Sequence, residues 1–365
     1  MGGWNALIAD GTRQCEESWT MMPQFLPLAA ILSQSLYSEP QPEDIAVYQN
    51  WITGCDNMRN CAAVALQAPT SGTDGNTDHL EAMVEIPLAA HIAPTVAFRF
   101  PATLRHRPDL RIFVDQLEVP LSSAGIGHFK IAGAKARRIV QSMRKGQWVY
   151  LRDVKGEAVA RTSLAGLTAA LLRIDKQQGK LETPDAIVRR GKRIAYDDLP
   201  GYSVSLSRPA VPTSPPTEPK SKALDDNREQ CGGDAPEETS KPSFVRLDSD
   251  NSLAIVPWAC GSGAYVRYSS IMIISNQGEI RPAEFDYDNG ITGDGPSNVQ
   301  AEVIWLEKER VLESATRFRA IGDCGRTDRY IWDGYKFRLS EQLVMPECRG
   351  SFDRIRVWKT EVADR

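Results

Sequence analysis

The chain has 365 residues, of which 42% are hydrophobic and 25% are charged. This composition is typical of a globular protein and excludes a largely disordered, fibrous or membrane-embedded one. The length is about twice that of an average domain, so we expect two hydrophobic cores. The formal net charge of −4 gives no general attraction to polyanions, and nucleic acid is not an expected partner.

The first 38 residues predict an export signal. Residues 25–32, FLPLAAIL, form an apolar run that is too short to span a bilayer but has the length of a signal-peptide core. Serines after the run offer cleavage sites, and Met21 and Met22 before it offer a later start of translation. No Lys or Arg lies between Met21 and the run, so a buried N-terminal helix of a cytosolic protein stays open as the alternative. We expect a periplasmic protein without a transmembrane segment.

Residues 39–207 are expected to form a first domain made mainly of strands. Short apolar runs predict two strands within 47–66, on either side of a turn at Asp56 and Asn57. Further strands are predicted at 81–88, 94–100, 110–115, 117–121, 147–154 and 158–162, the last two joined around Lys155 and Gly156.

Two short helices are predicted in the same domain. Gly146 can end the first, whose apolar face has helical spacing: Ala136, Ile139, Val140 and Met143. Residues 164–174 have a similar amphipathic pattern and predict the second helix.

Residues 208–241 predict a disordered linker. The segment is rich in Pro, Ser, Glu and Lys and has almost no large apolar residue, so it cannot bury enough surface to fold. Cys231 is the one residue expected to anchor the second half of the linker to the domain that follows. The linker would separate the first domain from a second one at 242–365.

The pattern of residues 242–365 predicts that the second domain is an antiparallel β-meander. Strands are expected at 271–274, 303–306, 315–321, 329–339 and 355–362. Asp333 and Gly334 lie between two alternating apolar runs and predict a hairpin with a type I′ turn, which needs positive φ at both central residues.

Seven cysteines occur, and six remain if cleavage removes Cys15. An even number without any C-x-x-C spacing favours structural disulfides over a zinc ribbon or a redox motif. The sequence leaves the connectivity open, but nearness favours the pairs Cys55–Cys61, Cys231–Cys260 and Cys324–Cys348. Free thiols in a reducing cytosol are the alternative.

Several motifs, in this order, resemble the signature of the bacterial family of domains of unknown function numbered 1176. They are WITGCDNMRNC at 51–61, ACGSGAY at 259–265, GDCG at 322–325, WDG at 332–334 and CRG at 348–350. The resemblance runs from about 47 to 362 and implies six cysteines, an export signal and periplasmic residence. It implies no reaction.

The first domain also resembles the invasion-associated locus B family. Trp51, the Cys55/Cys61 pair, the predicted first helix and residues 163–171 carry this likeness. It implies an immunoglobulin-like β-sandwich. The sequence departs from that family by lacking a second cysteine pair near 127–131, and an invasion role does not transfer with a fold.

The search for catalytic or metal-binding patterns assigns no residue. No nucleophile elbow, zinc-protease helix, P-loop or dinucleotide fingerprint occurs, and no cofactor is expected. Ser262 lies between two glycines, but a tight turn beside Cys260 explains it better. Two further sets lack metal-site spacing: the histidines His79, His91, His106 and His128, and the oxygen donors Asp286, Asp288, Asn289 and Asp294.

One cluster is predicted as a binding surface: Asp323, Arg326, Asp328, Trp332 and Arg349. A Cys324–Cys348 bridge would gather these residues on a rigid scaffold, and Arg and Trp are common in binding hot spots. The alternative is that Trp332 fills the core while Asp323 and Arg349 make structural hydrogen bonds.

These features favour a non-catalytic envelope protein, either a binding or a maintenance module with an unknown ligand. An envelope hydrolase acting on a sugar or peptide is the alternative, with an acidic pair such as Asp286 and Asp288. Two carboxylates about 5–10 Å apart in a deep cleft would favour the hydrolase. A shallow aromatic surface would favour binding.

Overall fold

The structure is a computed structural model that describes residues 45–68, 78–89, 92–120, 127–194, 203–219, 224, 241–263, 266–287 and 297–364. These residues belong to one compact unit. The predicted signal peptide, the second half of the predicted linker with Cys231, and the residues His91, Asp288, Asn289 and Asp294 lie outside the described ranges. Within those ranges no helix is long and apolar enough to cross a membrane.

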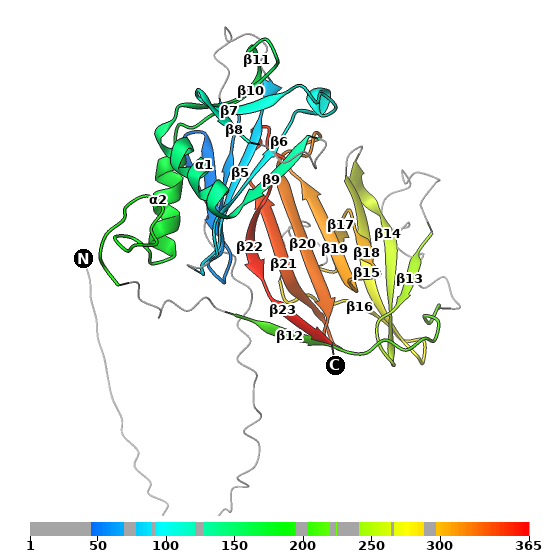
Figure 1. Ribbon diagram of the computed structural model, residues 1–365. Coiled ribbons are helices and arrows are strands. Elements are labelled where there is room, and N and C mark those ends of the chain that lie inside the picture. Colours follow the sequence, from blue (N-terminus) through cyan, green and yellow to red (C-terminus); the bar gives the residue numbers. More distant parts are fainter. Residues whose placement is uncertain are drawn as a thin grey trace, which may run out of the picture. The chain divides into compact units, whose positions relative to one another are not determined.

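The first half of the described chain contains two sheets (Figure 1). The larger is antiparallel, with the strand order β1 (Ala46–Tyr48), β2 (Trp51–Cys55), β3 (Cys61–Ala65), β5 (Glu81–Ile86), β6 (Thr95–Arg99) and β9 (His128–Ala132). The smaller has the order β4 (Asp78–His79), β11 (Ala158–Ser163), β10 (Trp148–Arg152), β7 (Arg111–Val114) and β8 (Leu117–Val119). The predicted strands of this half are confirmed, with ends shifted by a few residues.

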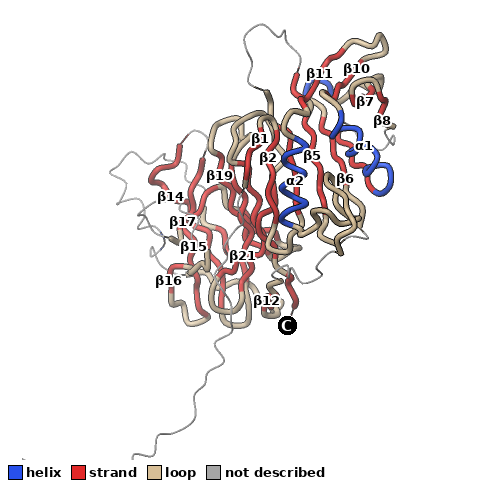
Figure 2. The backbone as a smooth tube through the Cα atoms, turned by 90° about the vertical axis from the view of Figure 1, so that its left-hand side faces the viewer, coloured by secondary structure: helices blue, strands red, loops and turns tan. Residues whose placement is uncertain are grey.

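The two predicted helices are also confirmed. α1 (Gly133–Lys145) buries Ala136, Ile139, Val140 and Met143, as their spacing predicts, and ends at Gly146. α2 (Leu167–Gln177) begins after Gly166, whose φ is 97° and where a Cβ would lie 1.8 Å from the Tyr48 carbonyl oxygen. Both helices lie against the larger sheet (Figure 2), and a short 3-10 helix, η1 (Ala102–Leu104), follows β6.

The second half is built from two more five-stranded sheets. One contains β13 (Ser243–Arg246), β14 (Asn251–Gly263), β15 (Val266–Ser275) and β16 (Ile280–Pro282), with β17 (Val299–Ala301) also paired to β15. The other is β18 (Ile304–Leu306), β19 (Val311–Arg317), β20 (Gly325–Trp332), β21 (Phe337–Met345) and β22 (Ile355–Lys359) in sequence order. All pairs are antiparallel, so the second sheet is the expected meander.

The central strands of the larger sheet are buried on both faces. One face joins the helices and the smaller sheet in a core that contains Trp51 and Phe98. The opposite face forms a second core, in which Ile52 and Val64 pack with Ile355 and Val357 of β22. Every residue of β2 and β3 is therefore buried.

Two segments at the predicted domain boundary pair with the second half. β12 (Ser205–Arg208) runs parallel to β23 (Glu361–Asp364). Beyond it, the Thr217 N–H donates to Ser252 Oγ at 2.8 Å, and Arg246 Nη2 donates to the Pro215 carbonyl at 2.8 Å. The first part of the expected linker thus has defined partners, while the division into two domains stays a prediction.

Two local predictions in the meander are wrong. The β20–β21 turn contains four residues, since Trp332 pairs with Phe337, and only Gly334 has a positive φ. The Asp333 carboxylate accepts the Tyr335 and Lys336 N–H groups and favours this wider loop over a type I′ turn. The strand predicted at 315–321 ends at Arg317, and Phe318 and Ile321 are exposed.

Candidate functional site

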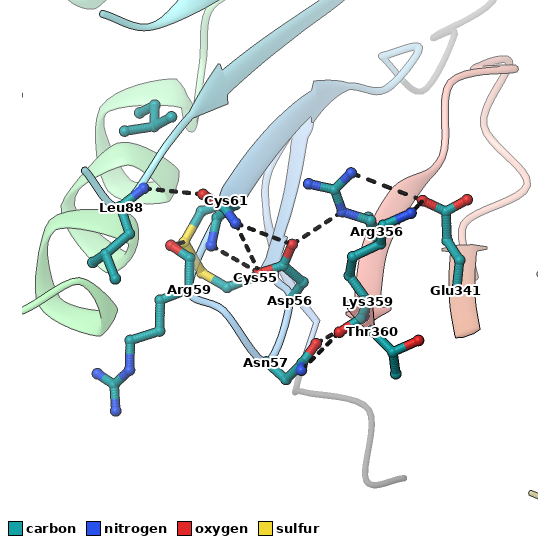
Figure 3. A network of polar contacts seen from close by, with 12 residues as sticks. Cys55, Asp56, Asn57, Arg59, Cys61, Leu88, Glu341, Arg356, Lys359 and Thr360 are labelled. Carbon is teal, nitrogen blue, oxygen red and sulfur yellow. Dashed lines mark hydrogen bonds and ion pairs between the residues drawn. A yellow bond between two sulfur atoms is a disulfide. The ribbon is translucent and has the colours of Figure 1, made fainter. Parts of the chain in front are cut away.

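The turn closed by the Cys55–Cys61 disulfide connects the larger sheet to β22 (Figure 3). The Asp56 side chain is fully buried, accepts the Asn60 N–H at 2.9 Å and lies 3.0 Å from Arg356 Nε. Arg356 also lies 3.8 Å from Glu341 on β21. A buried carboxylate needs such partners. Asp56 therefore both fixes the turn, through Asn60, and holds β22, through Arg356.

Asn57 supplies the second connection of this turn. Its Nδ2 donates to the Lys359 carbonyl at 2.9 Å, and its Oδ1 accepts the Lys359 N–H at 2.8 Å. The side-chain amide thereby replaces the two backbone bonds that a neighbouring strand would make to β22. The motif at 51–61 has a structural role that links residues 300 positions apart.

Asn57→Ala should lower the free energy of unfolding by about 2 kcal/mol, because it leaves two backbone groups of Lys359 without their partner. Chemical unfolding monitored by tryptophan fluorescence measures the change. Arg59→Ala is the matched control in the same turn, since it removes one hydrogen bond to the Gln177 carbonyl and leaves Lys359 paired. An equal loss in both variants would contradict the role of Asn57.

The Cys324–Cys348 disulfide is also formed, and Asp323 and Arg349 lie beside it. Asp323 is buried, accepts Arg319 Nε at 2.6 Å and the Gly350 N–H at 2.7 Å, and these bonds lower its pKa against the opposing effect of burial. Arg349 donates to the carbonyls of Gln49 and Gln67 at 2.8 and 3.0 Å. Both residues are used in holding loops together.

Arg326, Asp328 and Trp332 share one face of β20 with Tyr330, since side chains alternate along a strand. Arg326 Nε lies 3.0 Å from Asp328 Oδ2, and Gln342 Nε2 donates to Asp328 at 2.7 Å. Trp332 is 3% exposed, and its Nε1 donates to Asp248 at 2.6 Å. These side chains line the interior of the second half.

The five residues of the predicted binding surface are therefore not one exposed cluster. Arg326 and Trp332 are separated by six residues of strand, about 20 Å. The disulfide brings Asp323 and Arg349 together but does not bring Trp332 to them. Their use in ligand binding stays a prediction, while their contacts match the structural alternative.

The residues considered for catalysis have structural contacts as well. Asp286 accepts the Leu339 N–H at 2.8 Å and lies 3.9 Å from Arg338 Nη1. Burial lowers the pKa of His79 to about 4, which keeps this side chain neutral. The described side chains contain no group of three His, Cys, Asp or Glu residues that could hold a metal ion, and the side chain of Ser262 lies outside the description.

The outward face of the smaller sheet carries a layer that the sequence analysis missed. Val149 and Leu151 of β10 point into the core, so Trp148, Tyr150 and Arg152 point outward. Phe113 of β7 and Arg161 of β11 flank Tyr150 on the neighbouring strands. We call these five half-buried residues the arginine–aromatic face.

The arginines of this face lie against its rings. The Arg161 guanidinium carbon is 4.5 Å from the Trp148 ring centroid, and that of Arg152 is 4.5 Å from the Tyr150 centroid and 5.7 Å from that of Phe113. Such cation–π contacts hold long side chains in place, and Arg152 Nη1 also donates to the Gly156 carbonyl at 2.9 Å. The face therefore combines three aromatic rings with two positive charges.

A family model described as a protein of unknown function, DUF1176, matches residues 46–363. The chain belongs to this family. The matched range spans all four large sheets, so the DUF1176 fold comprises both halves of the described chain. In this DUF1176 member the signature motifs at 51–61, 322–325 and 348–350 form the two disulfide-linked turns.

Two further proteins are similar to this DUF1176 chain. "Uncharacterized protein YpfG" of Escherichia coli strain K12 is 28% identical over 218 residues, which are 57% of this chain and 60% of that protein. The chain thus spans about 60% of the length of this relative. The crystal structure of invasion associated protein B from Bartonella henselae is 20% identical, with a TM-score of 0.28, and covers 37% of this chain and 98% of its own.

Proposed function

We propose that the protein is an exported, non-catalytic binding protein of the cell envelope, and that its arginine–aromatic face holds a sugar chain that carries acidic groups. One observation carries the proposal: three aromatic rings and two guanidinium groups lie together on the outward side of three adjacent strands. A flat sheet presents such side chains at fixed spacing, so little conformational entropy is lost when a ligand binds.

The side chains of the face suit both parts of this ligand. Trp148 and Tyr150 offer apolar ring surface with a polar atom at the edge, which suits a sugar ring that is apolar on its faces and polar around them. The positive charges of Arg152 and Arg161 attract a carboxylate or phosphate. Arg111 adds positive charge at the edge of the face, although Glu118 lies 3.9 Å from its Nε.

Export is supported by the two disulfides, because such bonds persist in oxidising compartments such as the periplasm. The apolar run at 25–32 and a third bond, Cys231–Cys260, belong to the same proposal. We also propose that residues 39–207 form an immunoglobulin-like β-sandwich domain and that 242–365 form a second domain. The shared core between Ile52 and Val357 would then be their interface.

The proposal predicts that Trp148→Ala weakens binding to purified peptidoglycan sacculi about tenfold, because a central aromatic side chain of a binding face contributes on the order of 1–2 kcal/mol. Arg161→Ala should have a similar effect, since it removes one of the two positive charges of the face. Co-sedimentation of the protein with sacculi measures the affinity, and mass spectrometry without reductant on the periplasmic fraction checks export and disulfide pairing.

Tyr335→Ala is the matched control, because Tyr335 is an exposed aromatic residue on the β20–β21 loop of the other half. It should leave sedimentation unchanged. Wild-type protein that does not sediment with sacculi, or a Trp148→Ala variant that sediments as well as wild type, would overturn the assignment of this face.

A further inference from the structure

The end of β19 and the loop that follows it, residues 317–323, expose large apolar side chains at the surface. Phe318 is 52% exposed and Ile321 is 62% exposed, and Arg317 and Arg319 lie between and beside them. Single exposed apolar residues are common on proteins, but a set of them around one rigid loop marks an interaction surface.

The loop is held in one conformation. The Phe318 N–H donates to the Cys324 carbonyl at 3.1 Å, and Cys324 is bonded to Cys348. The buried Asp323 carboxylate accepts Arg319 Nε at 2.6 Å from within the loop and the Gly350 N–H at 2.7 Å from the neighbouring loop. A fixed backbone therefore keeps the Phe318 and Ile321 side chains at the surface.

Two further contacts fix the base of the loop. Gly325 begins β20 with a φ of 150°, and a Cβ at this position would lie 2.1 Å from the Thr316 carbonyl oxygen. Gly322 has a φ of 75°, which favours glycine at the last turn before the disulfide. β19 and β20 lie side by side in Figure 1 and pair as far as Arg317 and Gly325, so the chain turns within residues 318–324.

The charge around this loop is positive. Arg317 and Arg319 belong to it, and Arg354 lies near both Arg317 and Glu313. The acid of the loop itself, Asp323, is buried and paired with Arg319. Exposed Phe and Ile side chains among arginines fit a surface that is apolar below and negatively charged above, as the headgroup region of an anionic lipid bilayer is.

We propose that residues 317–321 dock on a membrane surface that contains anionic phospholipid. Phe318 and Ile321 enter the boundary between headgroups and acyl chains, and Arg317 contacts the lipid phosphates. A lipid surface accepts these side chains without a complementary pocket, which suits exposed apolar side chains on a fixed loop. This contact is separate from the arginine–aromatic face, so one protein could hold a sugar chain while it lies on a bilayer.

The test is co-sedimentation of the full chain, with its disulfides formed, with vesicles of phosphatidylethanolamine and phosphatidylglycerol. Phe318→Ser/Ile321→Ser should reduce the bound fraction at least about tenfold, because most of the inserted apolar surface is removed. Arg317→Glu should reduce it about fivefold in low salt and have a smaller effect in high salt, because salt screens the phosphate contact. Both variants change exposed side chains, and unchanged thermal unfolding verifies their folding.

Val154→Ser is the matched control, because Val154 is 79% exposed on the β10–β11 loop of the other half. It should bind vesicles like wild type, and the comparison removes any contribution from the apolar run at 25–32, which all variants share. Trp148→Ala should also keep vesicle binding, which distinguishes a failure of this inference from a failure of sugar binding. Equal vesicle binding by wild type and Phe318→Ser/Ile321→Ser would overturn the proposal and favour a protein partner for the loop.

Discussion

Glu81→Gln should raise the stability of the protein at pH 8 by up to about 3 kcal/mol and leave it nearly unchanged at pH 4. Burial raises the pKa of Glu81 from its ordinary value of 4.5 to about 7, and the nearby Asp353 adds to the shift, while the Phe352 N–H and Arg99 oppose it. The side chain lies where β5 meets the loop before β22, and its Oε2 accepts the Phe352 N–H at 2.8 Å.

The direction follows from proton binding. Between pH 4.5 and 7 the unfolded chain releases the Glu81 proton and the folded chain keeps it, so the stability of the wild type falls as pH rises through this range. Above pH 7 the folded carboxyl also ionises, and the loss becomes constant. Glutamine stays neutral at every pH and avoids the loss. Thermal unfolding midpoints of both proteins between pH 4 and 8 measure the difference.

Glu85→Gln on the same strand is the matched control. Partial burial acts to raise the pKa of Glu85, but the hydrogen bonds from Lys130 and Thr95 outweigh it and lower the pKa below its ordinary value. The folded protein therefore gains stability from ionised Glu85 above pH 4.5, and the variant should be less stable than wild type at pH 8. If Glu81→Gln also lost stability at pH 8, the buried carboxyl would be ionised at little cost.

Cys324→Ala/Cys348→Ala should lower the free energy of unfolding by about 3.5 kcal/mol. The bond closes a loop with a sequence separation of 24 residues, and the chain-entropy model assigns a loop of this length about that much stabilisation. Alanine is used instead of serine because Cys324 is fully buried. A serine hydroxyl at this position would lie in the core without a partner. Chemical unfolding under oxidising conditions measures the loss.

Cys55→Ala/Cys61→Ala is the comparison for this prediction. Its loop has a sequence separation of six, so the expected loss is smaller, about 2.4 kcal/mol. Reductant should lower the stability of the wild type and have much less effect on a variant in which Cys55, Cys61, Cys324 and Cys348 are all replaced by alanine. A larger loss from the short loop than from the long one would show that native contacts, and not chain entropy, dominate the stabilisation.

Local pattern was enough to predict most elements of the first half. The spacing of Ala136, Ile139, Val140 and Met143 defines a helix face because a helix repeats every 3.6 residues. Nearness in sequence was enough for the Cys55–Cys61 and Cys324–Cys348 pairs, which close short loops. Alternation also identified 147–154 as a strand, and the outward position of Trp148 and Tyr150 could have indicated the arginine–aromatic face.

The same reasoning failed where a partner far along the chain decides the outcome. Phe318 and Ile321 look like the outer half of a strand, yet the Asp323 carboxylate and the disulfide turn the backbone away after Arg317. Trp332 and Asp328 look like exposed binding residues, yet Asp248 and Gln342 satisfy them in the interior. A polar side chain in a sequence carries no sign of which distant group will pair with it.

From the sequence alone, a mostly β protein with two helices in its first half and disulfides at two turns could be predicted. No pattern in the sequence indicates that β2 and β3 are buried on both faces, that β12 pairs with β23 at the far end of the chain, or that Asn57 holds β22. Periodicity records which side of an element avoids water, whereas the element that covers that side is chosen by packing and hydrogen bonding between segments that the chain brings together only on folding.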